Sequence, residues 1–219
     1  MEPYKSAIEQ MAGVSLQILP NKSITGLIAL LDGRVDLAML SVPIATEIAV
    51  LRNSIPATSL DRLMGHHIAT TRIAFALHPS NPVRKASLDT VRRILAGHIV
   101  NWHEIGGPDL AIRVVFVKTG GVTQTVQSRL LDDGPIAAAH PIPMTSAEQV
   151  IKVVAQEPGA LGLAQIRLVA ASKQPELATD ETIEQHLVLV TLGAPTMAAL
   201  AVIEAARSIA QQRLAVAQH

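Results

Sequence analysis

The feature that most constrains the fold of this chain is the regular alternation of strand-like and helix-like segments. Residues 14–19 alternate apolar and polar side chains with the period of a strand. A periodic apolar run at residues 27–31 predicts a helix, and residues 35–40 predict the next strand. Further strands are expected at residues 72–77, 112–117 and 187–192. Because strands and helices alternate, we predict an α/β protein with parallel sheets.

Residues with fixed local roles mark where the helices begin and end. Gly13 is expected to stop a first helix over residues 3–11. Ser87 and Ser146 stand at the N-cap positions of the two helices that follow them. Pro195 opens a long alanine-rich helix near the end of the chain.

Composition excludes several classes of function. The 219 residues are 49% hydrophobic and 16% charged, which is enough for a large core. Eighteen Lys and Arg balance eighteen Asp and Glu, and aromatic residues are only 2%, so we expect no nucleic-acid partner. No stretch approaches the roughly 18 uninterrupted apolar residues of a membrane span, so the chain is predicted not to be membrane-spanning. Cysteine is absent, which excludes disulfides and thiolate nucleophiles.

Several segments carry a resemblance to a known family. The most specific are Arg72-Ile-Ala-Phe-Ala-Leu-His-Pro-Ser-Asn-Pro82, residues 88–97 and Asn101-Trp-His-Glu-Ile-Gly-Gly-Pro-Asp-Leu110. Three more segments match in the same order along the chain: residues 23–27, 31–38 and 158–163. Together they resemble the phosphate-binding proteins of ABC transporters, which belong to the type II periplasmic-binding-protein-like family.

The resemblance implies an architecture and a function. It implies two α/β lobes joined by two crossing strands, with residues 1–74 and 173–219 in the first lobe and residues 75–172 in the second. A small oxyanion such as phosphate would lie between the lobes, without a cofactor or a chemical reaction. The resemblance further implies a periplasmic or extracellular solute-binding protein with the membrane component of an ABC transporter as its partner, although residues 1–13 contain no secretory signal.

The family's ligand contacts carry over to two loops. The candidate ligand-binding residues are Ser23, Thr25, Ser41, Lys118, Gly120, Gly121, Val122 and Thr123. The family's second loop reads roughly Arg-x-x-Gly-Ser-Gly-Thr, whereas residues 117–123 read Val-Lys-Thr-Gly-Gly-Val-Thr. The bidentate arginine and the serine hydroxyl are therefore replaced. The family carboxylate that accepts a proton from hydrogen phosphate falls at Ser41.

Four of these candidates have a structural interpretation as well. Gly120 and Gly121 precede a helix whose N-terminus suits a tetrahedral oxyanion, but two glycines also suit a tight turn that needs unusual dihedral angles. Ser23 could cap a helix or contact the ligand. Lys118 could supply the charge lost with the arginine, or could simply be solvated.

A strand of the family fold is expected to be missing. The sequence begins at the family's first helix, so the preceding strand, which lies between the strands predicted at residues 14–19 and 35–40, is not represented. Removing an inner strand leaves backbone groups that need partners. Direct pairing of the neighbours, insertion of another segment, and a longer native chain are all open, and we favour the last.

Other chemistry-bearing residues do not form a catalytic constellation. His66 and His67 are adjacent, and adjacent residues of a strand point to opposite faces, which is poor geometry for binding one metal ion together. We interpret them as a loop pair. Trp102 is expected to pack its loop onto the second lobe. We predict no catalytic or metal-binding residue. A solute-binding protein is the first hypothesis, a ligand-sensing or interaction module that has lost phosphate is the second, and an enzyme is the third.

Overall fold

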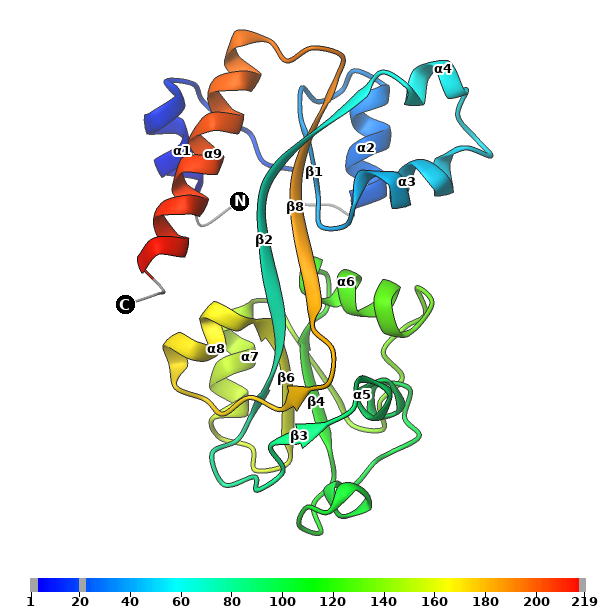
Figure 1. The fold of residues 1–219 in the computed structure, drawn as a ribbon, viewed down its shortest axis with the longest axis vertical. Helices are drawn as coiled ribbons and strands as arrows, with labels where there is room; N and C mark the ends of the chain where they lie inside the picture. The colour runs from blue at the N-terminus through cyan, green and yellow to red at the C-terminus, as the bar shows by residue number, and fades with distance from the viewer. Residues whose placement is uncertain (1–3, 20–22, 217–219) are drawn as a thin grey trace. The chain divides into compact units, whose positions relative to one another are not determined.

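The chain forms two compact units. The computed structural model describes residues 4–19 and 23–216. Unit 1 comprises residues 1–70 and 186–219, and unit 2 comprises residues 71–185. The chain passes between the units within the two long strands β2 (Leu63–Leu77) and β8 (Ile183–Leu192) (Figure 1). Residues 71–74 and 173–185, expected in the first lobe, belong to unit 2, because Ile73, Leu177 and Ile183 are buried in its core.

In unit 1, helices pack around the first part of β2, up to Thr70, and the last part of β8, from His186. The other elements of this unit are α1 (Lys5–Ala12), α2 (Ser23–Leu31), β1 (Ala38–Leu40), α3 (Ile44–Leu51), α4 (Ala57–Leu60) and α9 (Met197–Val216). β1 pairs antiparallel with β8, with Met39 opposite Leu189. Alternation along β8 separates two apolar clusters: Leu189 packs with residues of α1 and α9, and Val188 packs with residues of α2 and α3.

The expected strand at residues 14–19 is not a strand in the structure. Gly13 ends α1 in a left-handed conformation at φ +67°, as predicted. After it, the Glu9 carboxylate accepts the Leu16 backbone N–H at 2.7 Å, so a side chain takes the place of a neighbouring strand. In the described part of the chain β1 is the edge strand, without strand pairing to residues 14–19.

Unit 2 is built around β6 (Ala160–Gln165), β4 (Arg113–Val117) and β5 (Pro141–Met144). β4 runs parallel to both β5 and β6, whereas β2 pairs antiparallel with β6. Over the described residues, the sheet order is β1-β8-β2-β6-β4-β5. The prediction of parallel pairing is therefore right for β4, β5 and β6. It is wrong for the pairs β1–β8 and β2–β6, which are antiparallel.

Four helices and a small ribbon complete unit 2. They are α5 (Leu88–Leu95), α6 (Gly121–Leu130), α7 (Ala147–Val154), α8 (Ile166–Ser172), and the parallel pair β3 (Lys85–Ala86) and β7 (Ala178–Thr179). The predicted serine caps are confirmed: the Ser87 hydroxyl accepts the Thr90 N–H, and the Ser146 hydroxyl accepts the Gln149 N–H. These caps fix where α5 and α7 begin.

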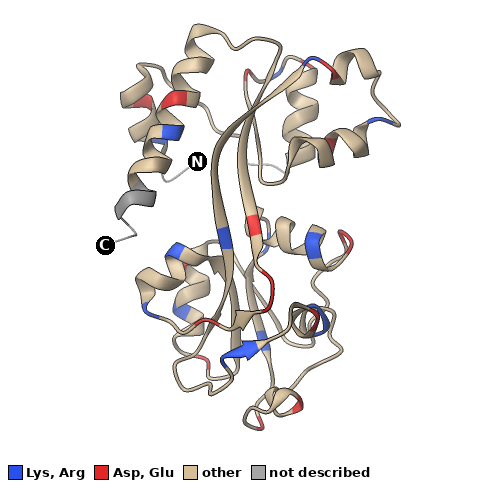
Figure 2. Ribbon diagram, viewed as in Figure 1, with Lys and Arg blue, Asp and Glu red and all other residues tan. Residues whose placement is uncertain are grey.

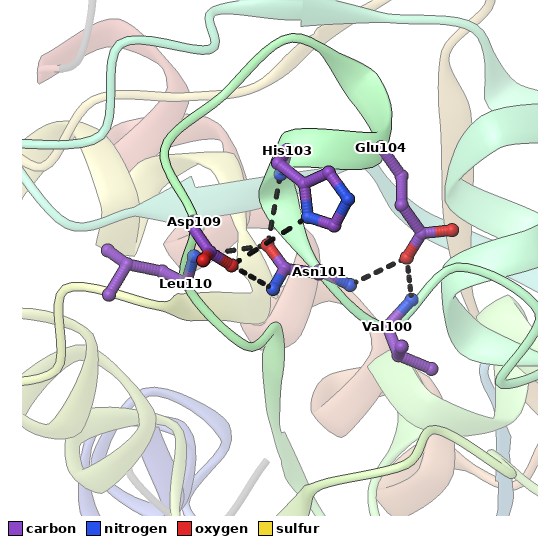
Figure 3. A network of polar contacts seen from close by, with 6 residues as sticks. All are labelled: Val100, Asn101, His103, Glu104, Asp109 and Leu110. Carbon is purple, nitrogen blue, oxygen red and sulfur yellow. Dashed lines mark hydrogen bonds and ion pairs between the residues drawn. The ribbon is translucent and has the colours of Figure 1, made fainter.

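The segment at residues 100–110 is ordered by its own polar groups (Figure 3). Glu104 accepts the backbone N–H groups of Val100 and Asn101 at 2.8 and 2.9 Å, and the Asn101 side chain accepts the His103 N–H in return. These bonds lower the pKa of the Glu104 carboxyl because they favour its charged form. Trp102, in the short 3-10 helix Trp102–Ile105, is fully buried and donates its Nε1–H to the Gly159 carbonyl at 2.9 Å, which confirms its predicted packing role.

Basic and acidic residues are mixed along both units. Lys and Arg are interspersed with Asp and Glu in both units, in keeping with the balanced composition (Figure 2). Across residues 4–19 and 23–216, the helices lack the length and apolar character that crossing a membrane requires.

Candidate functional site

Two of the predicted ligand residues meet in unit 1. Ser23 is the first residue of α2 and only 7% exposed, and its hydroxyl accepts the Ser41 backbone N–H at 3.3 Å. Ser41 directly follows β1, so this bond ties the loop after the strand to the start of the helix. Thr25 lies exposed in the first turn of the same helix. The Ser23 hydroxyl therefore has a structural role as an acceptor, a bond that does not use its own proton.

The other predicted residues surround the N-terminus of α6 in unit 2. Gly120 is the N-cap residue, with φ −149° and ψ 154°, an extended conformation that any residue adopts. Neither Gly120 nor Gly121 has a positive φ. The interpretation that these glycines serve unusual dihedral angles is therefore wrong. A Cβ at Gly120 would instead lie 3.3 Å from Val117 Cγ1, a tight contact.

The N-terminus of α6 offers backbone donors rather than side chains. Gly120 has no side chain to cap the helix, so the N–H groups of Gly121, Val122 and Thr123 have no acceptor within the helix. They lie at the positive end of the helix dipole. The Val122 side chain packs against the core of unit 2. The Thr123 hydroxyl donates to the Val117 carbonyl at 2.7 Å.

Lys118 lies at the start of this loop. Its backbone N–H donates to the Met144 carbonyl at 3.0 Å, which extends the pairing of β4 and β5 by one residue, and its side chain is exposed. An exposed ammonium three residues before α6 adds positive charge to the same region without fixing a geometry. The helices α5 and α7 of this unit differ from α6 in that a serine hydroxyl already occupies their first turn.

The histidine pair lies in strand β2, so its interpretation as a loop pair is wrong. The two rings have different partners: His66 Nε2 lies 2.9 Å from Thr191 Oγ1, and His67 Nε2 lies 3.0 Å from Thr70 Oγ1. Burial, and then the charge of Arg207, lower the pKa of His66. In the described part of the chain, groups of three or more potential metal-ligating side chains are absent.

The sequence interpretation missed a second cluster, around His67. Thr70 Oγ1 also lies 3.2 Å from His186 Nδ1, and the two imidazole rings are 6.5 Å apart between centroids. Both rings line an open groove of about 290 Å³ whose other walls are Pro43, Ile44, Gly65 and Val188. These groups come from three distant parts of the sequence, and no local pattern connects them.

The two α/β units joined by two long strands, with loops that offer oxyanion donors, define a type II periplasmic-binding-protein-like fold. The chain belongs to the family described as the PBP superfamily domain, whose model matches residues 1–209. This confirms the resemblance drawn from the sequence.

Individual relatives agree with this assignment. The chain is 28% identical over 173 residues to the phosphate-binding protein PstS of Bacillus subtilis (strain 168), covering 79% of this chain. It spans only 55% of the length of that relative. An ABC-type phosphate transport receptor from Vibrio cholerae has a similar fold, with a TM-score of 0.76, 17% identity, and coverage of 99% of this chain and 92% of the receptor.

The same fold also occurs in a regulator. The regulatory domain of NMB2055 (MetR), a LysR family regulator from Neisseria meningitidis (N. meningitidis), matches with a TM-score of 0.65 and 10% identity, covering 94% of this chain and 85% of that domain. At this level of identity the similarity concerns the fold alone.

Proposed function

We propose that this chain is a solute-binding protein that captures a small oxyanion such as phosphate outside the cytoplasmic membrane and delivers it to an ABC transporter, with no chemical step. The observation that carries the proposal is the N-terminus of α6, which has three backbone N–H groups without an acceptor in the helix and Lys118 close by in sequence. The names of the relatives from Bacillus subtilis and Vibrio cholerae support phosphate as the first ligand to test.

Each unit contributes its own candidate contacts. In unit 2 these are the backbone donors of Gly121, Val122 and Thr123 together with the Lys118 ammonium. In unit 1 they are Ser23, Thr25 and Ser41, which supply hydroxyls at the start of α2 and after β1. All of these groups are neutral except one lysine, so neutral hydrogen bonds dominate the proposed site.

This donor set predicts modest affinity and soft selectivity. A relative with an arginine and a carboxylate at the corresponding positions should bind phosphate roughly ten- to hundredfold more tightly, the effect of one charge-assisted hydrogen bond of about 1.5–3 kcal/mol. A serine both donates and accepts, whereas a carboxylate only accepts when ionised and rejects ligands without a proton. Sulfate should therefore compete with phosphate at Ser41.

Proline at the first position of α6 tests the proposal directly. Gly121→Pro removes one backbone donor, and the extended conformation of Gly120 is the one that a residue before proline prefers. The matched control is Ala147→Pro at the first position of α7, which also follows an extended residue, Ser146. We expect calorimetric titration with phosphate to give a roughly tenfold weaker affinity for Gly121→Pro and an unchanged one for Ala147→Pro. Equal affinity of both variants and the wild type would refute the assignment of α6.

A ligand-sensing module that has lost phosphate is the second candidate. The replacement of the arginine, together with the fold similarity to a LysR-type regulatory domain, favours it. Calorimetry with a panel of oxyanions separates the two functions. Binding of phosphate or sulfate supports the solute-binding protein, and failure of the whole panel supports the sensing module.

A further inference from the structure

The His67, Thr70 and His186 side chains form a continuous hydrogen-bonded row in unit 1. Thr70 Oγ1 lies 3.0 Å from His67 Nε2 and 3.2 Å from His186 Nδ1. A hydroxyl has one proton to donate, so it can donate to at most one of the two rings, and the other ring must donate to it. When both rings carry a proton on these nitrogens, the hydroxyl accepts twice and its own proton is released for another acceptor.

The row borders a groove with apolar walls. Pro43, Ile44 and Val188 line the groove together with the two histidines. Apolar walls strengthen the attraction between an imidazolium and an anion, because they replace water near the charges. Pro43 lies two residues after Ser41, so the groove adjoins the loop that holds the first group of candidate ligand residues.

The neighbouring elements α9, β8 and α3 carry charged groups. Arg207 of α9 donates its Nε–H to the His67 carbonyl at 2.8 Å. Glu184 precedes His186 by two residues in β8, and Glu47 lies in the first turn of α3.

We propose that His67, Thr70 and His186 contact the bound oxyanion and that protonation of the two imidazoles strengthens its binding. The inference rests on the proposed function and adds two ionisable rings to the candidate contacts of unit 1, which are otherwise neutral hydroxyls. Imidazole is the side chain whose ordinary titration range lies between about pH 5 and pH 8. When both rings are protonated they carry positive charge, and the Thr70 hydroxyl can turn its proton toward the anion. The ligand class is a small tetrahedral oxyanion, and its capture is accompanied by proton uptake.

The test compares three glutamine variants in phosphate titrations at about pH 6 and pH 7.5. The variants are His67→Gln, His186→Gln and the control His66→Gln, whose ring bonds to Thr191 instead of Thr70. Protonation of phosphate itself is common to all variants, so their differences report on the imidazoles. We expect a roughly tenfold loss of affinity at pH 6 for the first two variants and almost none for the control.

A second measurement protects the test against misfolding. The side-chain resonances of His67 and His186 in the wild-type protein should shift when phosphate is added, whereas those of His66 should not. The inference is wrong, while the proposed function stands, if the wild type binds phosphate and either of two results is found. The first is that all three variants have the affinity of the wild type, and the second is that the control loses as much affinity as the other two variants. If the wild type binds no phosphate at either pH, both are wrong.

Discussion

Replacing Thr123 by valine separates a structural from a ligand-binding role of its hydroxyl. The side chain is 2% exposed and donates to the Val117 carbonyl at 2.7 Å. Valine has nearly the same shape but no hydroxyl, so the variant removes one buried hydrogen bond without opening a cavity. We therefore expect Thr123→Val to lower the free energy of unfolding by about 1–3 kcal/mol.

Urea unfolding at neutral pH measures this change, and thermal unfolding should show a fall in Tm of about 2–4 °C for each kcal/mol in a chain of this length. Thr123→Ser is the matched control, because it keeps the hydroxyl and should retain most of the stability. Phosphate affinity, measured below the unfolding transition, should be unchanged in both variants, since the contact assigned to this position is the backbone N–H. A stable Thr123→Val protein with phosphate affinity reduced tenfold or more would refute this reasoning.

Three further substitutions have defined outcomes. Trp102→Phe removes the Nε1–H bond to the Gly159 carbonyl, which keeps a second donor, the Arg113 N–H at 2.9 Å. We expect the free energy of unfolding in urea to fall by about 1–3 kcal/mol. An unchanged unfolding midpoint would contradict a stabilising role of the buried bond. The pKa of Glu104 is lowered in the folded chain, so its stabilisation is complete above the unfolded pKa and disappears as the pH falls through the folded one. Glu104→Gln should therefore lose less stability than the wild type between pH 7 and pH 3, and identical acid profiles would contradict this. Ser41→Asp should raise the preference for phosphate over sulfate in competition titrations, and a parallel change for both anions would count against a ligand contact at this position.

Elements with local signals could be predicted from the sequence. Ser87 and Ser146 cap α5 and α7 as expected, because a hydroxyl accepts a first-turn N–H whatever surrounds it. Helix α5 accordingly begins at Leu88, directly after its predicted cap. The buried position of Trp102 followed from the tendency of a lone aromatic side chain to anchor a core rather than to hold a ligand.

Elements decided by distant partners could not be predicted. The first half of β2 contains Gly65 and two histidines, which suggest a loop, yet the strand continues through them from Leu63. Residues 14–19 have the alternation of a strand but no strand partner in the described part of the chain, and Glu9 binds their backbone instead. Propensity describes single segments, whereas pairing depends on what lies beside them.

The candidate site also has a part that could be predicted from the sequence and a part that could not. The family resemblance located the residues around α6 and the Ser23 and Ser41 pair, but it did not indicate which atoms remain available. The structure assigns the Thr123 hydroxyl and the Val122 side chain to packing, which leaves backbone donors. His186 could not be connected with Thr70, since 116 positions separate them in the chain.

The glycine at the start of α6 leaves that helix end without a side-chain cap. Gly120 adopts an extended backbone conformation open to any residue, and α5 and α7 have serine at the same N-cap position. Serine at Gly120 would fit the backbone conformation but would need the Val117 side chain, 3.3 Å from the new Cβ, to shift slightly. Its hydroxyl would then accept a first-turn N–H that is assigned to the anion. One change at this residue would thus give a protein of the same fold whose α6 N-terminus is closed by its own side chain, as in α5 and α7.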